Sequence, residues 1–177
     1  MILTGPEIAA AVRDGRIRIT DYTDAQVNPN SYNVRLGDTL TVYAEEIIDP
    51  HRDNTTCTRH IGADGYVLQP GELYLGHTVE EVGSDAFVPL LFGRSSVGRL
   101  GLFVEITAPI GDIGFHGQWT LMLSPVRPLK VYAGMKIGQI MFFLSVGPVS
   151  LYSGKYQSTC GPQPSRYWHD AKPTVAR

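Results

Sequence analysis

The chain of 177 residues has little of several features that would define its class. It has two cysteines, Cys57 and Cys160, which are too few for a disulfide framework. No apolar run approaches the roughly 18 residues that a membrane-spanning helix requires, so no membrane association is expected. The first residues lack both the basic flank and the long apolar stretch of a secretory leader. We therefore expect a cytoplasmic protein.

Charge is also scarce. Asp, Glu, Lys and Arg make up 18% of the residues, and the formal net charge is −2. Because no basic field surrounds such a chain, we expect no nucleic-acid partner, although a local cation cluster can still hold a small polyanion. The length and the hydrophobic fraction of 43% are sufficient for one domain with a real core.

Helix signals are confined to the N-terminus. Residues 4–7 have the form of a capping box with Pro6 in the first turn, and Gly15 suits a helix end. The following short apolar runs, separated by turn residues, predict an all-β sandwich or barrel. The expected strands are 32–36, 39–43, 66–69, 73–79, 87–92, 102–108, 119–123, 130–132 and 136–144. We place one domain at 1–161 and a flexible C-terminal tail at 162–177.

The polar segment 49–64 is expected to be a long surface loop. It holds Cys57 and His60, but no second ligand pair stands at zinc-site spacing. We therefore expect no direct metal ligand there.

The segment 93–102 reads Gly-Arg-Ser-Ser-Val-Gly-Arg-Leu-Gly-Leu. Arg94 and Arg99 bracket the hydroxyls of Ser95 and Ser96 between two apolar stretches. Guanidinium forks, hydroxyls and backbone N–H groups are the donors that bind polyphosphate. The alternative is a polar turn whose arginines pair with surface carboxylates.

A second candidate site is the segment 107–118, where we expect a hairpin that presents Asp112 and Phe115 at its turn. Such a hairpin can hold a flat base against its backbone and a sugar against the aromatic ring. The alternatives are an ordinary turn aspartate and a core phenylalanine.

These two segments, in this order, resemble the dCTP deaminase and dUTPase superfamily, and the deaminase branch most closely. Further matches are 28–37 (Asn-Pro-Asn-Ser-Tyr-Asn-Val-Arg-Leu-Gly), 68–73, 133–139 and the lid-like 152–157. The resemblance implies a dUTPase-like β-roll, or β-clip, that assembles as a homotrimer with active sites shared between subunits.

The resemblance also assigns roles. A pyrimidine deoxynucleoside triphosphate would carry Mg²⁺ on its phosphates. Asp112 would bind the sugar 3′-hydroxyl and orient the water that attacks the α-phosphorus. The triphosphate would be held by Arg94, Ser95, Ser96, Arg99 and Lys155. The sugar and base would be held by Ala108, Asp112, Phe115 and Tyr152.

Departures from the family pattern bear on the reaction. Met122 stands where deaminases carry the glutamate that moves protons during attack of water on cytosine, and a thioether cannot transfer a proton. Glu105 is a candidate for a relocated carboxylate. The other departures are Asn33 for an aspartate, Ile110 for an arginine and Thr159 for a glutamine.

Three functions therefore compete. The first is a dUTPase-type pyrophosphohydrolase that gives the monophosphate and pyrophosphate, and the retained Asp112 favours it. The second is a dCTP deaminase with a displaced acid/base group. The third is a non-catalytic nucleotide-binding regulator.

Overall fold

The structure is a computed structural model that describes residues 1–170. In chain order its elements are α1 (Gly5–Arg13), β1 (Ile17–Ile19), η1 (Asp24–Gln26), β2 (Val27–Asn28), β3 (Ser31–Arg35), β4 (Thr39–Tyr43), β5 (Thr56–His60), β6 (Tyr66–Leu68), β7 (Tyr74–Ser84), β8 (Phe87–Gly93), α2 (Ser95–Gly98), β9 (Leu102–Phe103), β10 (His116–Pro125), β11 (Leu129–Val131), β12 (Lys136–Leu144) and η2 (Tyr167–His169). The predicted β-rich fold with a short N-terminal helix is confirmed. No helix in this range is long and apolar enough to cross a membrane.

The N-terminal helix begins where the sequence predicts. Thr4 is its N-cap and Pro6 lies in the first turn, but the Thr4 side chain forms no capping hydrogen bond, so the predicted capping box is not made. Gly15 follows the helix with a φ of +73°, a left-handed conformation that favours glycine. The helix buries Ile8 and Ala11 against the sheets.

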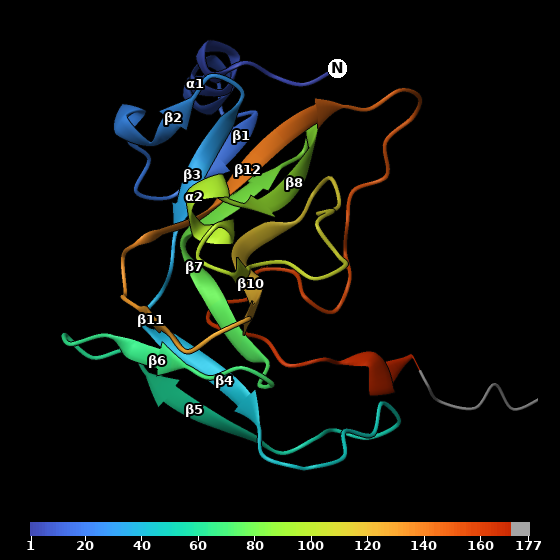
Figure 1. Cartoon of the computed structure of the whole chain (residues 1–177). Coiled ribbons are helices and arrows are strands. Elements are labelled where there is room, and N and C mark those ends of the chain that lie inside the picture. Colours follow the sequence, from blue (N-terminus) through green and yellow to red (C-terminus); the bar gives the residue numbers. More distant parts are fainter. Residues whose placement is uncertain (171–177) are drawn as a thin grey trace, which may run out of the picture.

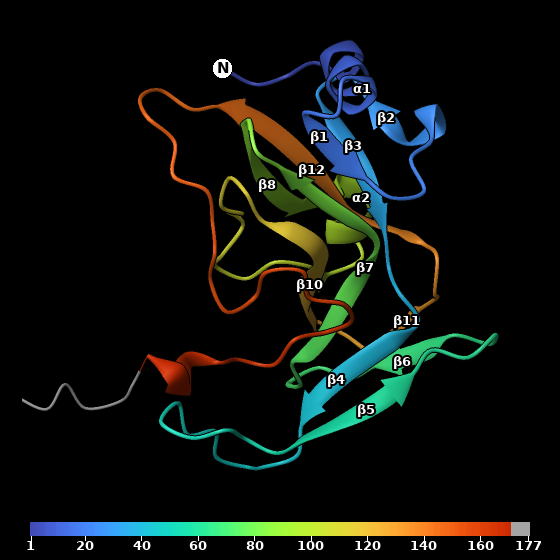
Figure 2. The same ribbon diagram turned by 180° about the vertical axis from the view of Figure 1, so that it is seen from behind.

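Three sheets make up the body. The largest has the order β5-β4-β7-β10-β9, with β1 paired to β7. A second sheet has the order β2-β3-β12-β8, and β11 pairs with β6. Figures 1 and 2 show the long strand β7 connecting the end of the molecule that carries α1 with the end that carries β4, β5 and β6.

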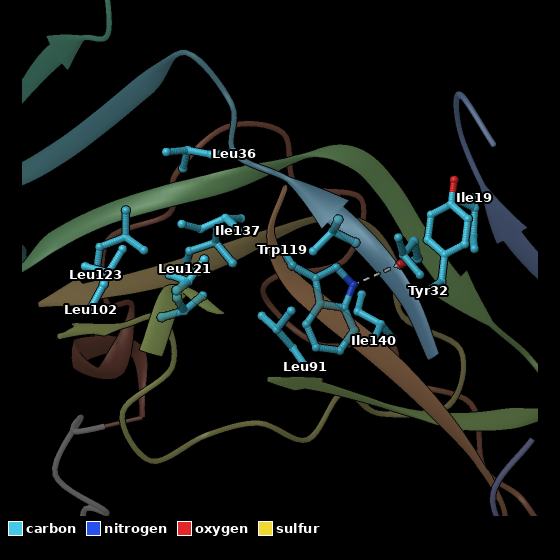
Figure 3. Close-up of a cluster of buried hydrophobic side chains, with 14 of the residues drawn as sticks. Ile19, Tyr32, Leu36, Leu91, Leu102, Trp119, Leu121, Leu123, Ile137 and Ile140 are labelled. Carbon is cyan, nitrogen blue, oxygen red and sulfur yellow. Dashed lines mark hydrogen bonds between the residues drawn. The ribbon is translucent and has the colours of Figure 1, made fainter. Parts of the chain in front are cut away.

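The core lies between the sheets and is built from inward-facing side chains (Figure 3). Trp119, Leu121 and Leu123 of β10 alternate with outward-facing residues, as expected for a strand with one buried face. They pack with Ile137 and Ile140 of β12, which are fully buried. The indole N–H of Trp119 donates to the carbonyl of Val82 at 3.1 Å, so this large ring is buried with its polar group satisfied.

Three further expectations about local structure are wrong. The strand expected at 102–108 is limited to Leu102–Phe103, and the chain then runs irregularly to Phe115, so the hairpin expected at 107–118 lacks its first strand and is a loop that leads into β10. The backbone there binds β8 instead, through Leu91 N–H to Pro109 O at 2.8 Å and Gly111 N–H to Pro89 O at 2.9 Å. The expected long loop 49–64 contains β5, because an edge strand pairs with β4 through its backbone and needs no apolar side chains.

The C-terminal segment, defined here as residues 151–166, packs against the body. Gln163 N–H donates to the Thr120 hydroxyl oxygen at 3.0 Å, and Ser165 N–H donates to the Tyr43 hydroxyl oxygen at 2.9 Å. Residues 162–166 of the tail predicted at 162–177 are thus bound to the domain. Residues 171–177 of that tail lie outside the described range.

Candidate functional site

A cavity of about 560 Å³ lies between β10 and the C-terminal segment. Its lining comes from β4, β7, the loop before β10, β10 itself and the C-terminal segment. The lining residues are Tyr43, Leu73, Leu75, Ala108, Ile110, Gly111, Asp112, Phe115, Gln118, Trp119, Thr120, Met122, Tyr152, Tyr156, Thr159, Gln163 and Ser165.

The floor of the cavity is the outward face of β10. Gln118, Thr120 and Met122 alternate with the buried positions of the strand, so all three project from the same face. In the register, Met122 lies opposite Leu75 of β7, which also lines the cavity. Strand alternation therefore delivers a row of side chains to the cavity.

The roof is the C-terminal segment, which adds to the edge of β10 through its backbone. Gln118 N–H donates to Thr159 O and Ser158 N–H donates to His116 O, both at 2.9 Å. The Gln118 side chain also accepts a hydrogen bond from Gly161 N–H at 2.6 Å. In Figures 1 and 2 the segment (red) passes from the side of β10 towards β4. The chain's own C-terminal segment thus forms one wall of the cavity.

The loop end of the cavity carries Asp112 and Phe115. The Phe115 ring packs edge-on against Trp119, with centroids 5.8 Å apart, and against Tyr152 at 6.1 Å. Gly111 is required here, because a Cβ would lie 2.2 Å from the Trp119 ring. Asp112 is exposed and, with Tyr152, also lines an adjoining cavity of about 510 Å³. This carboxylate therefore stands where two cavities meet.

Among residues 1–170, Asp112 is the single charged side chain that lines the larger cavity. The three lining tyrosines are held by backbone N–H groups that donate to their hydroxyl oxygens. These pairs are Ser165 to Tyr43, Tyr156 to Tyr152 and Arg166 to Tyr156, at 2.9, 3.1 and 2.7 Å. The lining thus offers one ionisable carboxylate beside an otherwise neutral surface.

The Arg-Ser-Ser motif forms the turn from β8 into α2. Arg94 is the N-cap of α2, and buried Val97 anchors the turn to the core. Ser95, Ser96 and Arg99 are exposed. Within residues 1–170 neither arginine forms an ion pair, so the alternative of pairing with surface carboxylates is not what this chain does. None of these donors lines the cavity of the same chain.

Lys155 and Glu105 also lie outside the cavity lining. The Lys155 ammonium pairs with the Asp170 carboxylate and lies 5.7 Å from the centroid of the Tyr156 ring. The Glu105 carboxylate accepts a hydrogen bond from Ala108 N–H, three residues further along the same loop. Ala108 itself lines the cavity, as do Ile110 and Thr159. Within its own chain the Glu105 carboxylate therefore bonds the loop and does not line the cavity.

Asn33, the departure in the first motif, is buried away from the cavity. Its side-chain amide N–H groups donate to Gln26 O and Asn28 Oδ1, both at 3.1 Å. It is part of a polar layer that includes the fully buried Glu80. The hydrogen bond between Arg35 and Glu80 raises the pKa of Arg35. Its position indicates a structural role in the layer between β3 and β7.

The sequence analysis missed most of the cavity walls. Gln118, Thr120 and Met122 share one face of β10, and strand alternation applied to 116–125 would have grouped them. Tyr43, Leu73 and Leu75 are brought in by strand pairing between segments remote in the sequence, which no local pattern signals. Within residues 1–170 no three His, Cys, Asp or Glu side chains lie close enough together to hold a metal ion.

The chain has a β fold, an Arg-Ser-Ser turn and a separate, largely neutral cavity. Together these features define a small-molecule-binding protein of the dUTPase-like fold class. The chain belongs to the dCTP deaminase-like family, whose model matches residues 2–145.

Similar proteins agree with this assignment. A protein of Leptospira biflexa named "dCTP deaminase, dUMP-forming" is 47% identical over 171 residues, which cover 96% of this chain and 98% of that protein. A protein of Hathewaya histolytica with the same name is 46% identical over 96% of this chain and 99% of its own length.

Among solved structures, a 2′-deoxycytidine 5′-triphosphate deaminase from Agrobacterium tumefaciens superposes with a TM-score of 0.65 at 23% identity. The match covers 81% of this chain and 48% of that one, so the chain spans about half the length of that structure. This likeness supports the fold.

Proposed function

We propose that the chain hydrolyses a pyrimidine deoxynucleoside triphosphate, dUTP in the first place, to the monophosphate and pyrophosphate. The observation that carries the proposal is the composition of the cavity. Among the described residues its lining has one charged group, Asp112, beside Phe115 and Tyr152, and a thioether at Met122, the position that the resemblance aligns with the proton carrier of a deaminase. The parts for sugar binding and water orientation are kept, whereas the part for deamination is replaced.

In this proposal the sugar lies against Phe115, and the ionised Asp112 accepts the 3′-hydroxyl hydrogen bond and orients a water molecule. The water oxygen forms a bond to the α-phosphorus while the bond to the bridging oxygen of pyrophosphate breaks. Catalysis of this kind depends on positioning and on neutralising the charge that spreads over the phosphate oxygens. Arg94, Ser95, Ser96 and Arg99 supply the donors for that neutralisation.

Those four donors do not line the cavity of their own chain, so the proposal places them in the site of a neighbouring copy. A homotrimer with shared sites, as the resemblance implies, meets this requirement. Magnesium would be held by the phosphate oxygens, because within residues 1–170 no cluster of three metal-ligating side chains exists and a small hard cation prefers oxygen. When bound, the metal neutralises phosphate charge.

The second candidate is the complete conversion of dCTP to dUMP, pyrophosphate and ammonia. It is favoured by relatives named "dCTP deaminase, dUMP-forming" that are 47% and 46% identical over 96% of this chain. Proton transfer to the cytosine ring then requires a group other than Met122, and Glu105 lies outside the cavity lining. A neighbouring copy would have to provide that group.

The test is incubation of the chain with Mg²⁺ and each of dUTP, dCTP, dTTP and dATP, with separate assays for pyrophosphate and ammonia. The proposal expects pyrophosphate from dUTP and no ammonia from dCTP. Equal amounts of ammonia and pyrophosphate from dCTP would replace it with the second candidate. Tight binding of dUTP with neither product would make the chain a nucleotide-binding regulator.

A further inference from the structure

The cavity extends well beyond its loop end. Asp112, Phe115 and Tyr152 mark one end, and the row Gln118, Thr120 and Met122 leads away from them along β10. At about 3.3 Å per residue this row spans about 13 Å, which is longer than a pyrimidine ring. A base held beside the sugar end therefore leaves ligand space unfilled further along the strand.

The far end of this space is apolar on every strand that forms it. Met122 lies opposite Leu75 in the register, and Leu75 in turn lies opposite Thr41 of β4. Tyr43 lies two residues after Thr41 on β4 and so projects from the same face, and Leu73, in the turn just before β7, also lines the cavity. The far end is thus a pocket of two leucines, a thioether and a phenol ring.

The polar groups between the two ends are already engaged within the chain. The Gln118 side chain donates to Val79 O at 3.1 Å and accepts from Gly161 N–H. The Thr120 and Tyr43 hydroxyl oxygens accept from Gln163 N–H and Ser165 N–H. Each of these side chains already has a hydrogen-bond partner within the chain, so water at this end gains less than in bulk and an apolar occupant is favoured.

From this geometry we infer that the far end of the cavity selects the base, and that the preferred ligand is a pyrimidine deoxynucleoside triphosphate with an apolar substituent at carbon 5. Carbon 4 lies directly opposite the sugar-bearing nitrogen and carbon 5 is its neighbour, so a substituent on carbon 5 projects obliquely away from Phe115 towards the far end. Met122 and Leu75 are then specificity-determining residues. The inference rests on the proposed function, because it uses the same cavity for the nucleotide.

The test is a ligand series that changes only this substituent: dUTP, dTTP, 5-ethyl-dUTP and 5-hydroxymethyl-dUTP. Dissociation constants are measured by calorimetry on the Asp112→Asn variant, and kcat/KM on the parent. Affinity should rise about fourfold for each carbon added from dUTP to 5-ethyl-dUTP. The hydroxymethyl compound has nearly the size of the ethyl compound but should bind about tenfold more weakly, because its hydroxyl is buried without a partner.

A matched pair of variants locates the effect. Met122→Asn should reduce the preference for ethyl over hydroxymethyl to within about twofold, since it places a polar group beside the substituent. Val67→Asn, at an exposed position on β6, should leave the preference unchanged. Melting temperatures of both variants show whether they fold. The ligand series on the parent chain tests the inference even if a variant does not fold.

The outcomes separate this inference from the proposed function. Turnover of dUTP with equal affinity along the series, or with the ethyl compound excluded, would overturn the inference and leave the proposed function standing. Equal affinity is also the result expected if a side chain of a neighbouring copy fills the far end. Failure of every nucleotide to bind would overturn both.

Discussion

The guanidinium Nε of Arg35 donates to Glu80 Oε1 at 2.7 Å, and the backbone N–H of the same arginine donates to Glu80 Oε2 at 2.9 Å. Glu80 is fully buried, and its carboxylate also accepts from the Gln26 side chain at 3.0 Å. One carboxylate thus joins β3 and η1 to β7. Two residues earlier on β7, the Thr78 hydroxyl oxygen accepts from Trp119 N–H at 2.9 Å where the β7–β10 register shifts.

Removal of the Arg35 side chain should therefore be costly. Arg35→Ala leaves a buried carboxylate without its cation, and we expect a loss of about 3 kcal/mol in the free energy of unfolding, at the lower end for buried pairs because the guanidinium is partly exposed. Urea denaturation measures it. Arg18→Ala, at an exposed position on β1, should change stability by less than about 0.5 kcal/mol. Equal losses in the free energy of unfolding for the two variants would show that the Arg35–Glu80 pair contributes nothing to stability.

Asp112→Asn tests the proposed hydrolytic role. The amide keeps the size of the carboxylate but loses its charge and basicity, so turnover should fall by about 10² or more. The phosphate contacts remain, so nucleotide affinity should change far less than the rate. Asp64→Asn, in the exposed turn before β6, is the matched control and should retain full pyrophosphate release. A folded Asp112→Asn variant with the parent rate would reduce Asp112 to a turn residue.

Met122→Glu should produce or raise ammonia release from dCTP. The substitution places a proton carrier in the cavity on the face of β10, and general acid/base groups are worth a factor of about 10² to 10⁴. Met122→Gln is the control of equal size that cannot ionise, and it should release no more ammonia than the parent. If a folded, dCTP-binding glutamate variant behaves like the glutamine variant, the obstacle to deamination lies elsewhere, with Ile110 and Thr159 as the next positions to change.

Arg99→Ala should weaken binding of the triphosphate by about 1.5 to 3 kcal/mol, as expected for the loss of one charge-assisted partner. Arg18→Ala again serves as the control.

Sedimentation should give three times the 19.4 kDa mass of one chain. If the sites are shared between copies, Arg99→Ala and Asp112→Asn chains that are unfolded, mixed and refolded together should recover activity at about a quarter of their sites. No recovery would place each site within a single chain.

Glu45 provides a pH-dependent contact outside the site. Hydrogen bonds from Arg52 and from Thr55 N–H lower the pKa of the Glu45 carboxyl from 4.5 to about 2. Because the folded pKa is depressed, this contact stabilises the segment above pH 4.5 and is lost as the pH falls towards 2. Carboxyl-resonance NMR titration measures the pKa. Arg52→Gln should return it towards 4.5, whereas Arg59→Gln on β5 should not.

Local patterns in the sequence determined several elements of this protein. The β-rich fold follows from short apolar runs between turn residues, and α1 follows from Pro6, the spaced apolar residues and Gly15. The placement of Asp112 and Phe115 beside each other also follows from chain proximity. Motif resemblance identified the family, because the spacing of these residues along the chain is itself the signal.

The tertiary structure decided what local patterns do not encode. Segment 102–108 has the composition of a strand, yet only Leu102–Phe103 forms one, and the backbone bonds to β8 come from Pro109 and Gly111, just beyond the segment. Lys155 pairs with Asp170, and residues 162–166 bind Thr120, Tyr43 and Tyr156 instead of remaining a tail.

The same reason explains the cavity. Its far end exists only because β4, β7 and β10 pair in one register, which brings Tyr43, Leu75 and Met122 to one face although up to 79 positions separate them in the chain. The sequence by itself predicted a set of nucleotide-binding residues. Strand pairing between remote segments, whose free energy depends on the whole packed sheet, decided which of them surround a common space.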